Sequence, residues 1–211
     1  MSRSKIRRRE FLGATAGLLL IGRGARADAV DDKLAAITRA RASLKTLVGP
    51  FTQVSTVGLL RTKVRAAGMM YFLAPNRLRW ELGPPDSVTY WVAPEAVAYR
   101  GQHGSGRLAV GARLPPDLEC LRAVLGGDAG ALRSRFDVRE APNPDGAGPA
   151  FEATPRPDAQ MKLRRMFFSL EPDLVRPRKA VMVFDERNQS EITFGELRRD
   201  APIDPALLVL P

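Results

Sequence analysis

Three segments read Gly49-Pro50-Phe51-Thr52-Gln53, Gly68-Met69-Met70-Tyr71-Phe72 and Pro75-Asn76-Arg77-Leu78-Arg79-Trp80-Glu81-Leu82. In the last of them, Leu78, Trp80 and Leu82 alternate with charged residues. Successive side chains of a β-strand point to opposite faces, so this alternation predicts a half-buried strand with one apolar and one charged face. Together the three segments predict neighbouring strands that line an apolar trough.

Further strands are expected along most of the chain, because short apolar and β-branched runs are separated by Gly-, Pro- and Asn-containing turns. The connections are short, which favours antiparallel neighbours. The expected strands are residues 49–57, 63–73, 77–82, 88–92, 96–100, 136–140, 150–154, 163–170, 178–186 and 190–196, with 107–110 as a further one.

Three helices are also expected. Residues 31–44 place Leu34, Ile37 and Leu44 on one helical face. A second helix begins after Pro115-Pro116 and is closed by Gly126-Gly127, and residues 129–135 form a third. Strands and helices do not alternate regularly, which indicates an α+β, mostly β fold. We expect one strongly curved antiparallel sheet of about ten or eleven strands with helices against one face.

The Gly-x-Phe-x-Gln strand, the apolar strand that follows it and the polar-apolar-polar-Trp strand resemble, in order and spacing, the LolA family of periplasmic outer-membrane lipoprotein carriers. Residues 184–194, Phe-Asp-Glu-Arg-Asn-Gln-Ser-Glu-Ile-Thr-Phe, resemble the Asp-rich hairpin before the family's terminal strands. The similarity spans residues 34–211. It implies an unclosed β-barrel whose concave face is covered by the N-terminal helix and by lid helices inserted mid-chain, here residues 115–135.

Apolar side chains on the concave face and on the lid form the binding site that the resemblance implies. Ordinary core packing is the alternative for any one of them, so the prediction rests on the whole set. The predicted cavity lining consists of Phe51, Met70, Phe72, Leu78, Trp80, Phe168, Met182 and Phe184. The predicted lid residues are Leu118, Leu121, Leu125, Gly126 and Gly127, the two glycines acting as a hinge.

Two positions depart from the family pattern. The family places an arginine immediately before the proline that precedes the Trp strand, where it bonds to the lid, whereas this chain has Ala74. The family's aromatic-Asp-Pro motif after the fifth strand is replaced by residues 99–103, Tyr-Arg-Gly-Gln-His. The sequence leaves open whether Arg77 or Arg79 takes over the role of the missing arginine.

Residues 1–27 are expected to be a twin-arginine-type signal peptide. Arg8-Arg9-x-Phe11-Leu12 precedes a weakly apolar run, and Ala25-Arg26-Ala27 fits a small-x-small cleavage site. About ten apolar residues are too few for a membrane-spanning helix, which needs about twenty; a retained anchor is the alternative. Cleavage near Ala27 leaves residues 28–211 as one carrier domain, soluble in the periplasm and without a cysteine at its start for lipid attachment.

Most of the formal charge of +10 belongs to this N-terminal segment. Residues 1–27 contain seven basic residues and one acidic residue, so removing their net +6 leaves +4. No aromatic-plus-basic recognition motif accompanies this modest excess, which argues against nucleic acid as a partner. The remaining basic residues favour solubility or contact with anionic lipid headgroups.

The residues needed for catalysis or metal binding are scarce. With one histidine and one cysteine in the chain, we expect neither a Cys-His pair nor a His-rich metal site. His103-Gly104-Ser105-Gly106 does not match Gly-x-Ser-x-Gly and is expected to be a hairpin loop. Asp185 and Glu186 are expected to be solvated turn residues, and Cys120 a small buried side chain. The sequence predicts neither an enzyme nor a cofactor.

The resemblance implies a monomeric carrier that accepts acylated lipoproteins from an inner-membrane ATP-driven release complex and passes them to an outer-membrane acceptor. Each methylene kept from water is worth about 0.8 kcal/mol, so two or three sixteen-carbon chains represent on the order of 25 to 40 kcal/mol. Free diffusion of such a cargo is excluded. Two alternatives stay open: a carrier of a free lipid or lipid-linked metabolite, and an envelope sensor that binds lipoprotein or lipid.

Overall fold

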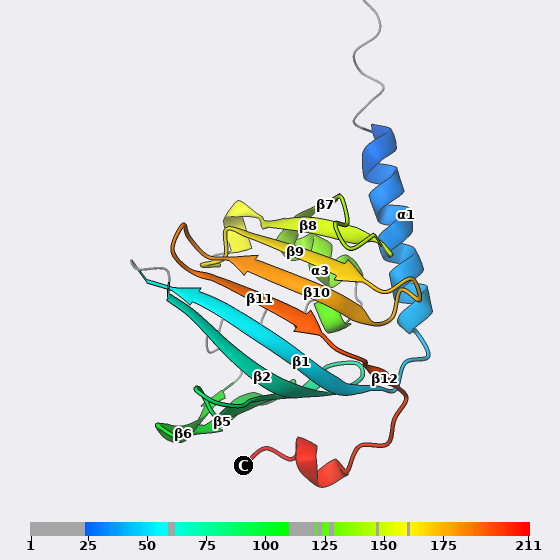
Figure 1. Ribbon diagram of the computed structural model, residues 1–211. Helices are drawn as coiled ribbons and strands as arrows, with labels where there is room; N and C mark the ends of the chain where they lie inside the picture. The colour runs from blue at the N-terminus through cyan, green and yellow to red at the C-terminus, as the bar shows by residue number, and fades with distance from the viewer. Residues whose placement is uncertain are drawn as a thin grey trace, which may run out of the picture.

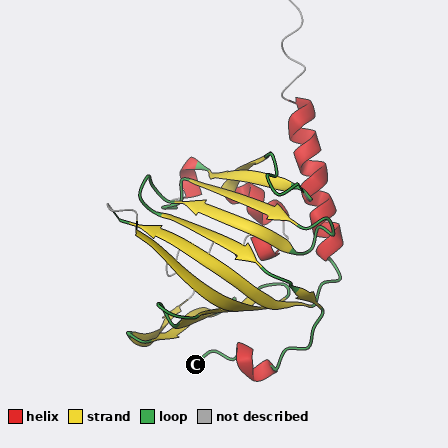
Figure 2. Cartoon of the chain, in the orientation of Figure 1, coloured by secondary structure: helices red, strands yellow, loops and turns green. Residues whose placement is uncertain are grey.

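The computed structural model describes residues 24–58, 62–109, 121, 124–126, 129–146, 148–159 and 161–211. Within these ranges the chain forms one twelve-stranded antiparallel sheet with an N-terminal helix and short helices (Figures 1 and 2). The strand order is β6-β5-β4-β3-β2-β1-β11-β10-β9-β8-β7, and β12 pairs with β1. The two end strands of this order, β6 and β7, do not pair with each other. The predicted mostly β fold with an unclosed antiparallel sheet is therefore confirmed.

The first half of the sheet contains β1 Thr46–Val57, β2 Thr62–Leu73, β3 Arg77–Leu82, β4 Val88–Val92, β5 Ala96–Gly101 and β6 Gly104–Ala109. The second half contains β7 Phe136–Glu140, β8 Ala150–Pro155, β9 Arg165–Leu170, β10 Pro177–Val183, β11 Gln189–Phe194 and β12 Arg198–Arg199. The helices are α1 Gly24–Arg41, α3 Ala129–Arg135 and the 3-10 turns η1 Pro157–Ala159 and η2 Pro205–Leu208.

Strands β1 and β2 form the centre of the sheet. Every residue of β1 pairs with a residue of β2, from Thr46 opposite Leu73 to Val57 opposite Thr62. On its other edge β1 pairs with β11, with Phe51 opposite Phe194. This pairing joins the N-terminal and C-terminal halves of the chain into one sheet, so the curvature of the trough depends on contacts between segments that are far apart in sequence.

The glycine that begins the second sequence motif is required by packing. A Cβ atom at Gly68 would lie 2.1 Å from Cζ of the Phe51 ring and 2.3 Å from the carbonyl oxygen of Glu81. Both separations are far below van der Waals contact. The ring of Phe51 therefore occupies the space that a side chain at position 68 would fill, which explains why glycine and phenylalanine occur together on these two strands.

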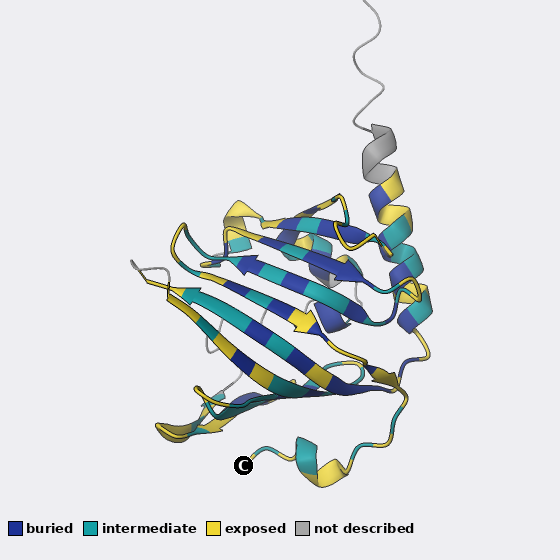
Figure 3. Cartoon of the chain, viewed as in Figure 1, coloured by how far each residue is buried: buried dark blue, intermediate teal, exposed yellow. Residues whose placement is uncertain are grey.

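Burial alternates along the strands and separates two faces of the sheet (Figure 3). On β3, Leu78 and Trp80 are buried, while Arg77 and Arg79 lie on the outer face. The buried side chains of the other strands join them in one hydrophobic core on the concave side. The predicted face assignment of the Trp strand is therefore correct.

Helix α1 stands beside the β7 end of the sheet, and α3 lies behind the sheet in Figure 1. Leu34 and Ile37 of α1 are buried, as the apolar spacing predicts, and so is Val30, which precedes the predicted helix. Ion pairs from α1 to its neighbours, Asp31 with Arg133 of α3 and Lys33 with Glu140 of β7, fix the helix in place.

The limits of several elements differ from the sequence prediction, most of all those of α1 and β10. Helix α1 begins at Gly24 rather than Asp31 and ends at Arg41 rather than Leu44, so the predicted cleavage position near Ala27 falls in its first turns. Cleavage there stays a prediction. Strand β10 ends at Val183 rather than Glu186, because the carboxylate of Asp185 accepts hydrogen bonds from the backbone N–H groups of residues 187 and 188 and closes a tight turn.

The C-terminal segment lies on the outer face of the sheet. The carbonyl oxygen of Leu207 in η2 accepts hydrogen bonds from Arg79 Nη1 at 3.0 Å and Trp91 Nε1 at 2.9 Å. The guanidinium of Arg79 also lies 4.8 Å from the centre of the Trp91 ring, in cation–π geometry. None of the helices in the described part of the chain has both the length and the apolar character needed to cross a membrane.

Replacing Gly68 by alanine is expected to destabilise the fold by about 1 to 3 kcal/mol, because the new methyl group displaces the Phe51 ring or the backbone of β3. Urea unfolding followed by circular dichroism measures this change. Ala67→Val is the matched control, since Ala67 is exposed on the opposite face of the same strand. An unchanged unfolding midpoint for Gly68→Ala would show that the packing of Phe51 is not as described.

Candidate functional site

The predicted lining residues lie together on the concave face because the strand register aligns them. Met70 is opposite Trp80 and Phe72 is opposite Leu78 on β2 and β3. Met182 is opposite Met166 on β10 and β9. Residues that are directly opposite share a face of the sheet. Seven predicted residues are at most 3 % exposed: Phe51, Met70, Phe72, Leu78, Trp80, Phe168 and Met182.

The eighth predicted residue, Phe184, is placed differently. It follows β10 instead of lying within it, and its backbone N–H donates to the carbonyl oxygen of Asn188 at 3.0 Å within the β10–β11 turn. Its side chain is partly buried against the edge of the core. Phe184 therefore lies at the rim of the concave face rather than on its floor.

Aromatic stacks form the two walls of the site. On one side the rings of Phe51 and Trp80 stack with centroids 3.6 Å apart at 21°, and Phe194 contacts Trp80 edge-on at 6.2 Å. On the other side Phe151 and Phe168 stack with centroids 5.2 Å apart. Sequence reasoning missed Phe151 and Phe194, although each continues the apolar alternation of a predicted strand.

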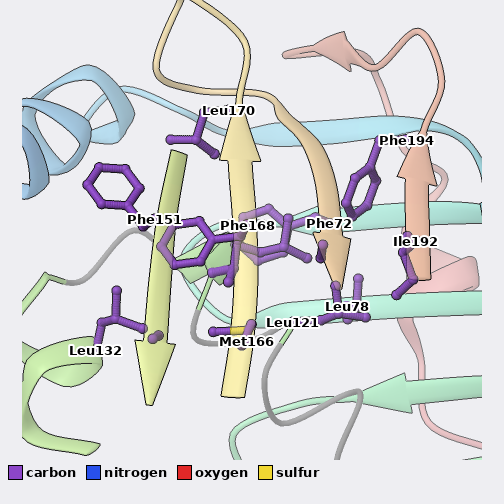
Figure 4. Close-up of a cluster of buried hydrophobic side chains, with 14 of the residues drawn as sticks. Phe72, Leu78, Leu121, Leu132, Phe151, Met166, Phe168, Leu170, Ile192 and Phe194 are labelled. Atoms are coloured by element: carbon purple, nitrogen blue, oxygen red, sulfur yellow. The ribbon is translucent and has the colours of Figure 1, made fainter. Parts of the chain in front are cut away.

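The lid segment is inserted between these walls. Leu121 and Leu125 are each 1 % exposed, and Val124 is also buried. Figure 4 draws Leu121 in the same buried cluster as Leu78 of β3 and Met166 of β9. Gly126, the last helical residue of this segment within the described ranges, is only partly buried. The other predicted lid residues, Leu118 and Gly127, lie outside the described residues.

The concave face is therefore filled by the protein's own side chains in this state. Access for a ligand requires the lid leucines to move, because they occupy the centre of the core. Two cavities lie at the edges of this packed region. One, of about 500 Å³, is at the end of the trough away from α1 and is lined in part by Gln53, Trp80, Leu82, Val88, Tyr90 and Tyr99.

The second cavity, of about 400 Å³, lies where α1, the lid and the β2–β3 turn meet. Its lining includes Arg41, Phe72, Ala74, Leu125 and Gly126. This cavity contains the position of the missing family arginine, Ala74, and the end of the lid. It is the place where a residue that controls lid movement is expected.

The side chain that holds the lid is Arg41, the last residue of α1. Its Nη1 donates to the carbonyl oxygens of Val124 and of Leu125, the latter at 3.3 Å, and its Nε donates to the carbonyl oxygen of Val175 at 3.1 Å. These bonds connect α1, the lid and the loop before β10. Burial lowers the pKa of the guanidinium to about 10, with Asp173 opposing the shift, so Arg41 is protonated at neutral pH.

Neither arginine left open by the sequence contacts the described part of the lid. Arg77 forms an ion pair with Glu95 at 3.0 Å, and Arg79 forms one with Glu81 in addition to its contacts with Trp91 and Leu207. Both lie on the outer face of the sheet. The strand alternation itself excludes them, because a residue that alternates with Trp80 cannot face the lid.

The family model described as "Outer membrane lipoprotein carrier protein LolA" matches residues 42–209. The chain belongs to the LolA family. This is a family of periplasmic, non-enzymatic carriers. Arg41 is the residue immediately before the matched region.

Solved structures resemble the fold at low sequence identity. LolA superfamily protein NE2245 from Nitrosomonas europaea has a TM-score of 0.44 and 10 % identity, covering 85 % of this chain and 96 % of that one. A DUF1329 family protein from Desulfovibrio piger has a TM-score of 0.48 and 13 % identity, covering 87 % of this chain and 97 % of that one. Lipoprotein LppX from Mycobacterium tuberculosis has a TM-score of 0.44 and 11 % identity, covering 84 % of this chain and 98 % of that one. The comparison with curated proteins found no match.

Arg41→Met is expected to loosen the lid, because the carbonyl oxygens of Val124 and Leu125 lose charge-assisted hydrogen bonds worth about 1.5 to 3 kcal/mol each. A loss of only about 1.4 kcal/mol accelerates opening tenfold. Amide hydrogen exchange at residues 121–126 should therefore be at least about tenfold faster. Arg77→Met, on the outer face, is the control. Equal exchange in both variants would mean that Arg41 does not hold the lid.

Proposed function

We propose that this protein is a periplasmic carrier that encloses the acyl chains of lipoproteins and moves them from the inner to the outer membrane. The observation that supports it best is an apolar concave face covered by a separate segment whose leucines are part of the core. Such a segment can move out of the core while every strand pair of the sheet stays formed. Membership of the LolA family supports the same function.

The energies favour replacement of the lid by cargo. Burial of Leu121 and Leu125 contributes about 1.5 to 3 kcal/mol each. The hydrogen bonds from Arg41 to the two lid carbonyl groups add a few kcal/mol more. Two or three long acyl chains gain on the order of 25 to 40 kcal/mol on leaving water. The closed lid therefore does not prevent the acyl chains from binding. The free energy of lid closure lowers the affinity of the protein for its cargo and assists release of the cargo.

The proposed partners are an inner-membrane ATP-driven release complex that delivers the lipoprotein and an outer-membrane acceptor that receives it. We also propose that the signal peptide of residues 1–27 is removed on export and that the carrier acts as a monomer. The predicted lining residues are the proposed contacts of the acyl chains, with Phe151 and Phe194 added to the two aromatic walls.

The two tryptophans provide a direct test, since the chain contains only these two and they lie on opposite faces of neighbouring strands. Trp91→Phe leaves Trp80, on the concave face, as the only tryptophan; Trp80→Phe leaves Trp91, on the outer face. A lipoprotein with brominated acyl chains should quench Trp80 and leave Trp91 unchanged, because bromine quenches indole fluorescence only at short range. The measurement is the loss of tryptophan emission during titration.

The same titration separates the alternatives. Quenching of Trp80 by the acylated lipoprotein, but not by its unacylated form, supports lipoprotein carriage. Quenching by a brominated free lipid with none by the lipoprotein favours a carrier of free lipid instead. Failure of both ligands to quench Trp80, or equal quenching of Trp91, would contradict the proposed site.

A further inference from the structure

Arg41 has hydrogen-bonding capacity that the lid does not use. Its Nε and Nη1 atoms donate to three carbonyl oxygens, but Nη2 is buried and has no hydrogen-bond partner among the described residues. A buried donor without a partner is costly, and more so when it carries charge. The guanidinium is therefore only partly satisfied by the closed lid.

Within the described residues, the charge of Arg41 is also not balanced by a carboxylate. Its three acceptors are neutral carbonyl groups, and no ion pair includes it within the described part of the chain. The acid that acts on it, Asp173, accepts hydrogen bonds from Arg176 Nε at 2.7 Å and from the backbone N–H groups of Val175 and Arg176 at 3.0 Å. Asp173 is thus engaged in its own turn.

The surroundings of Arg41 suit a ligand that is partly apolar. The cavity of about 400 Å³ beside it is lined by Thr38, Arg41, Ala42, Leu44, Phe72, Ala74, Pro75, Leu125 and Gly126. Among the described residues of this lining Arg41 alone is charged, and the hydroxyl group of Thr38 donates to the carbonyl oxygen of Leu34 at 3.1 Å. One guanidinium in an otherwise largely apolar cavity is complementary to an anionic group at the end of a hydrocarbon chain.

We propose that this cavity binds an oxyanion attached to an apolar chain, either the phosphate of a phospholipid or the carboxylate of a fatty acid, with Arg41 as its counter-ion. The inference rests on the proposed carrier function and specifies the polar end of the ligand. The oxyanion pairs with Nη2 and competes with the carbonyl oxygens of Val124 and Leu125 for the guanidinium. Binding of the anion therefore loosens the lid at the place where the apolar chain enters.

Four dodecyl probes that differ only in the polar group test this site: dodecyl phosphate, dodecanoate, dodecyl maltoside and dodecyltrimethylammonium. Calorimetric titration of the full chain is expected to show at least tenfold tighter binding of one or both anions than of the neutral and cationic probes. A preference for dodecyl phosphate identifies the phosphate as the source, and a preference for dodecanoate identifies the fatty acid. The favoured anion should also accelerate amide exchange at residues 121–126.

Three variants assign the preference to Arg41. Arg41→Met should abolish the anion preference while dodecyl maltoside still binds, which also reports that the variant is folded. Arg41→Lys should retain part of the preference, because the charge remains, and Arg77→Met should retain all of it. Equal binding of the four probes, or an anion preference that survives in Arg41→Met, would overturn the proposed site. Absence of binding by every probe would instead refute the carrier function on which it rests.

Discussion

An unclosed sheet with one apolar concave face must keep water from that face whether or not a ligand is present, and the other features of this chain follow from that constraint. A closed barrel satisfies it with strands alone, but β6 and β7 do not pair here. Helical segments cover the face instead, through α1 and through Leu121 and Leu125 of the lid. Because this covering shares no strand pairing with the sheet, it can leave while the sheet stays intact.

Arg41 both stabilises and destabilises the closed position of the lid. Its hydrogen bonds to Val124 and Leu125 are directional and are made only when the lid is in place. The same closure keeps the guanidinium buried without a carboxylate partner among the described residues, and this burial lowers the pKa of the group. Opening of the lid removes both contributions together. Such opposed terms keep the free energy of closure small compared with the free energy of enclosing an acyl chain, which reversible carriage requires.

Local patterns were sufficient to predict eleven of the twelve strands and the buried face of the Trp strand. The alternation around Trp80 identifies the concave face, and turn residues locate most strand ends within a few positions. Contacts distant in sequence were not predictable: Arg41 bonds to carbonyl oxygens more than eighty residues away, and backbone acceptors leave no mark in a sequence. β12 has only two residues, too few for a periodic pattern. The family pattern predicts an arginine at position 74, where this chain has Ala74. The guanidinium of Arg41 lines the same cavity as Ala74 but comes from α1.

The two walls of the trough differ from its floor in how they accept an apolar chain. The stacked rings, Phe51 on Trp80 in one half of the sheet and Phe151 on Phe168 in the other, give each wall a rigid aromatic surface. Methionines at the centre, with Met166 opposite Met182, have flexible side chains that fill irregular space. Rigid walls and an adaptable floor accept hydrocarbon chains of different lengths, because apolar contacts are not directional. Discrimination between ligands therefore has to occur at their polar ends, where directional hydrogen bonds and charge, unlike apolar contacts, distinguish one chemical group from another.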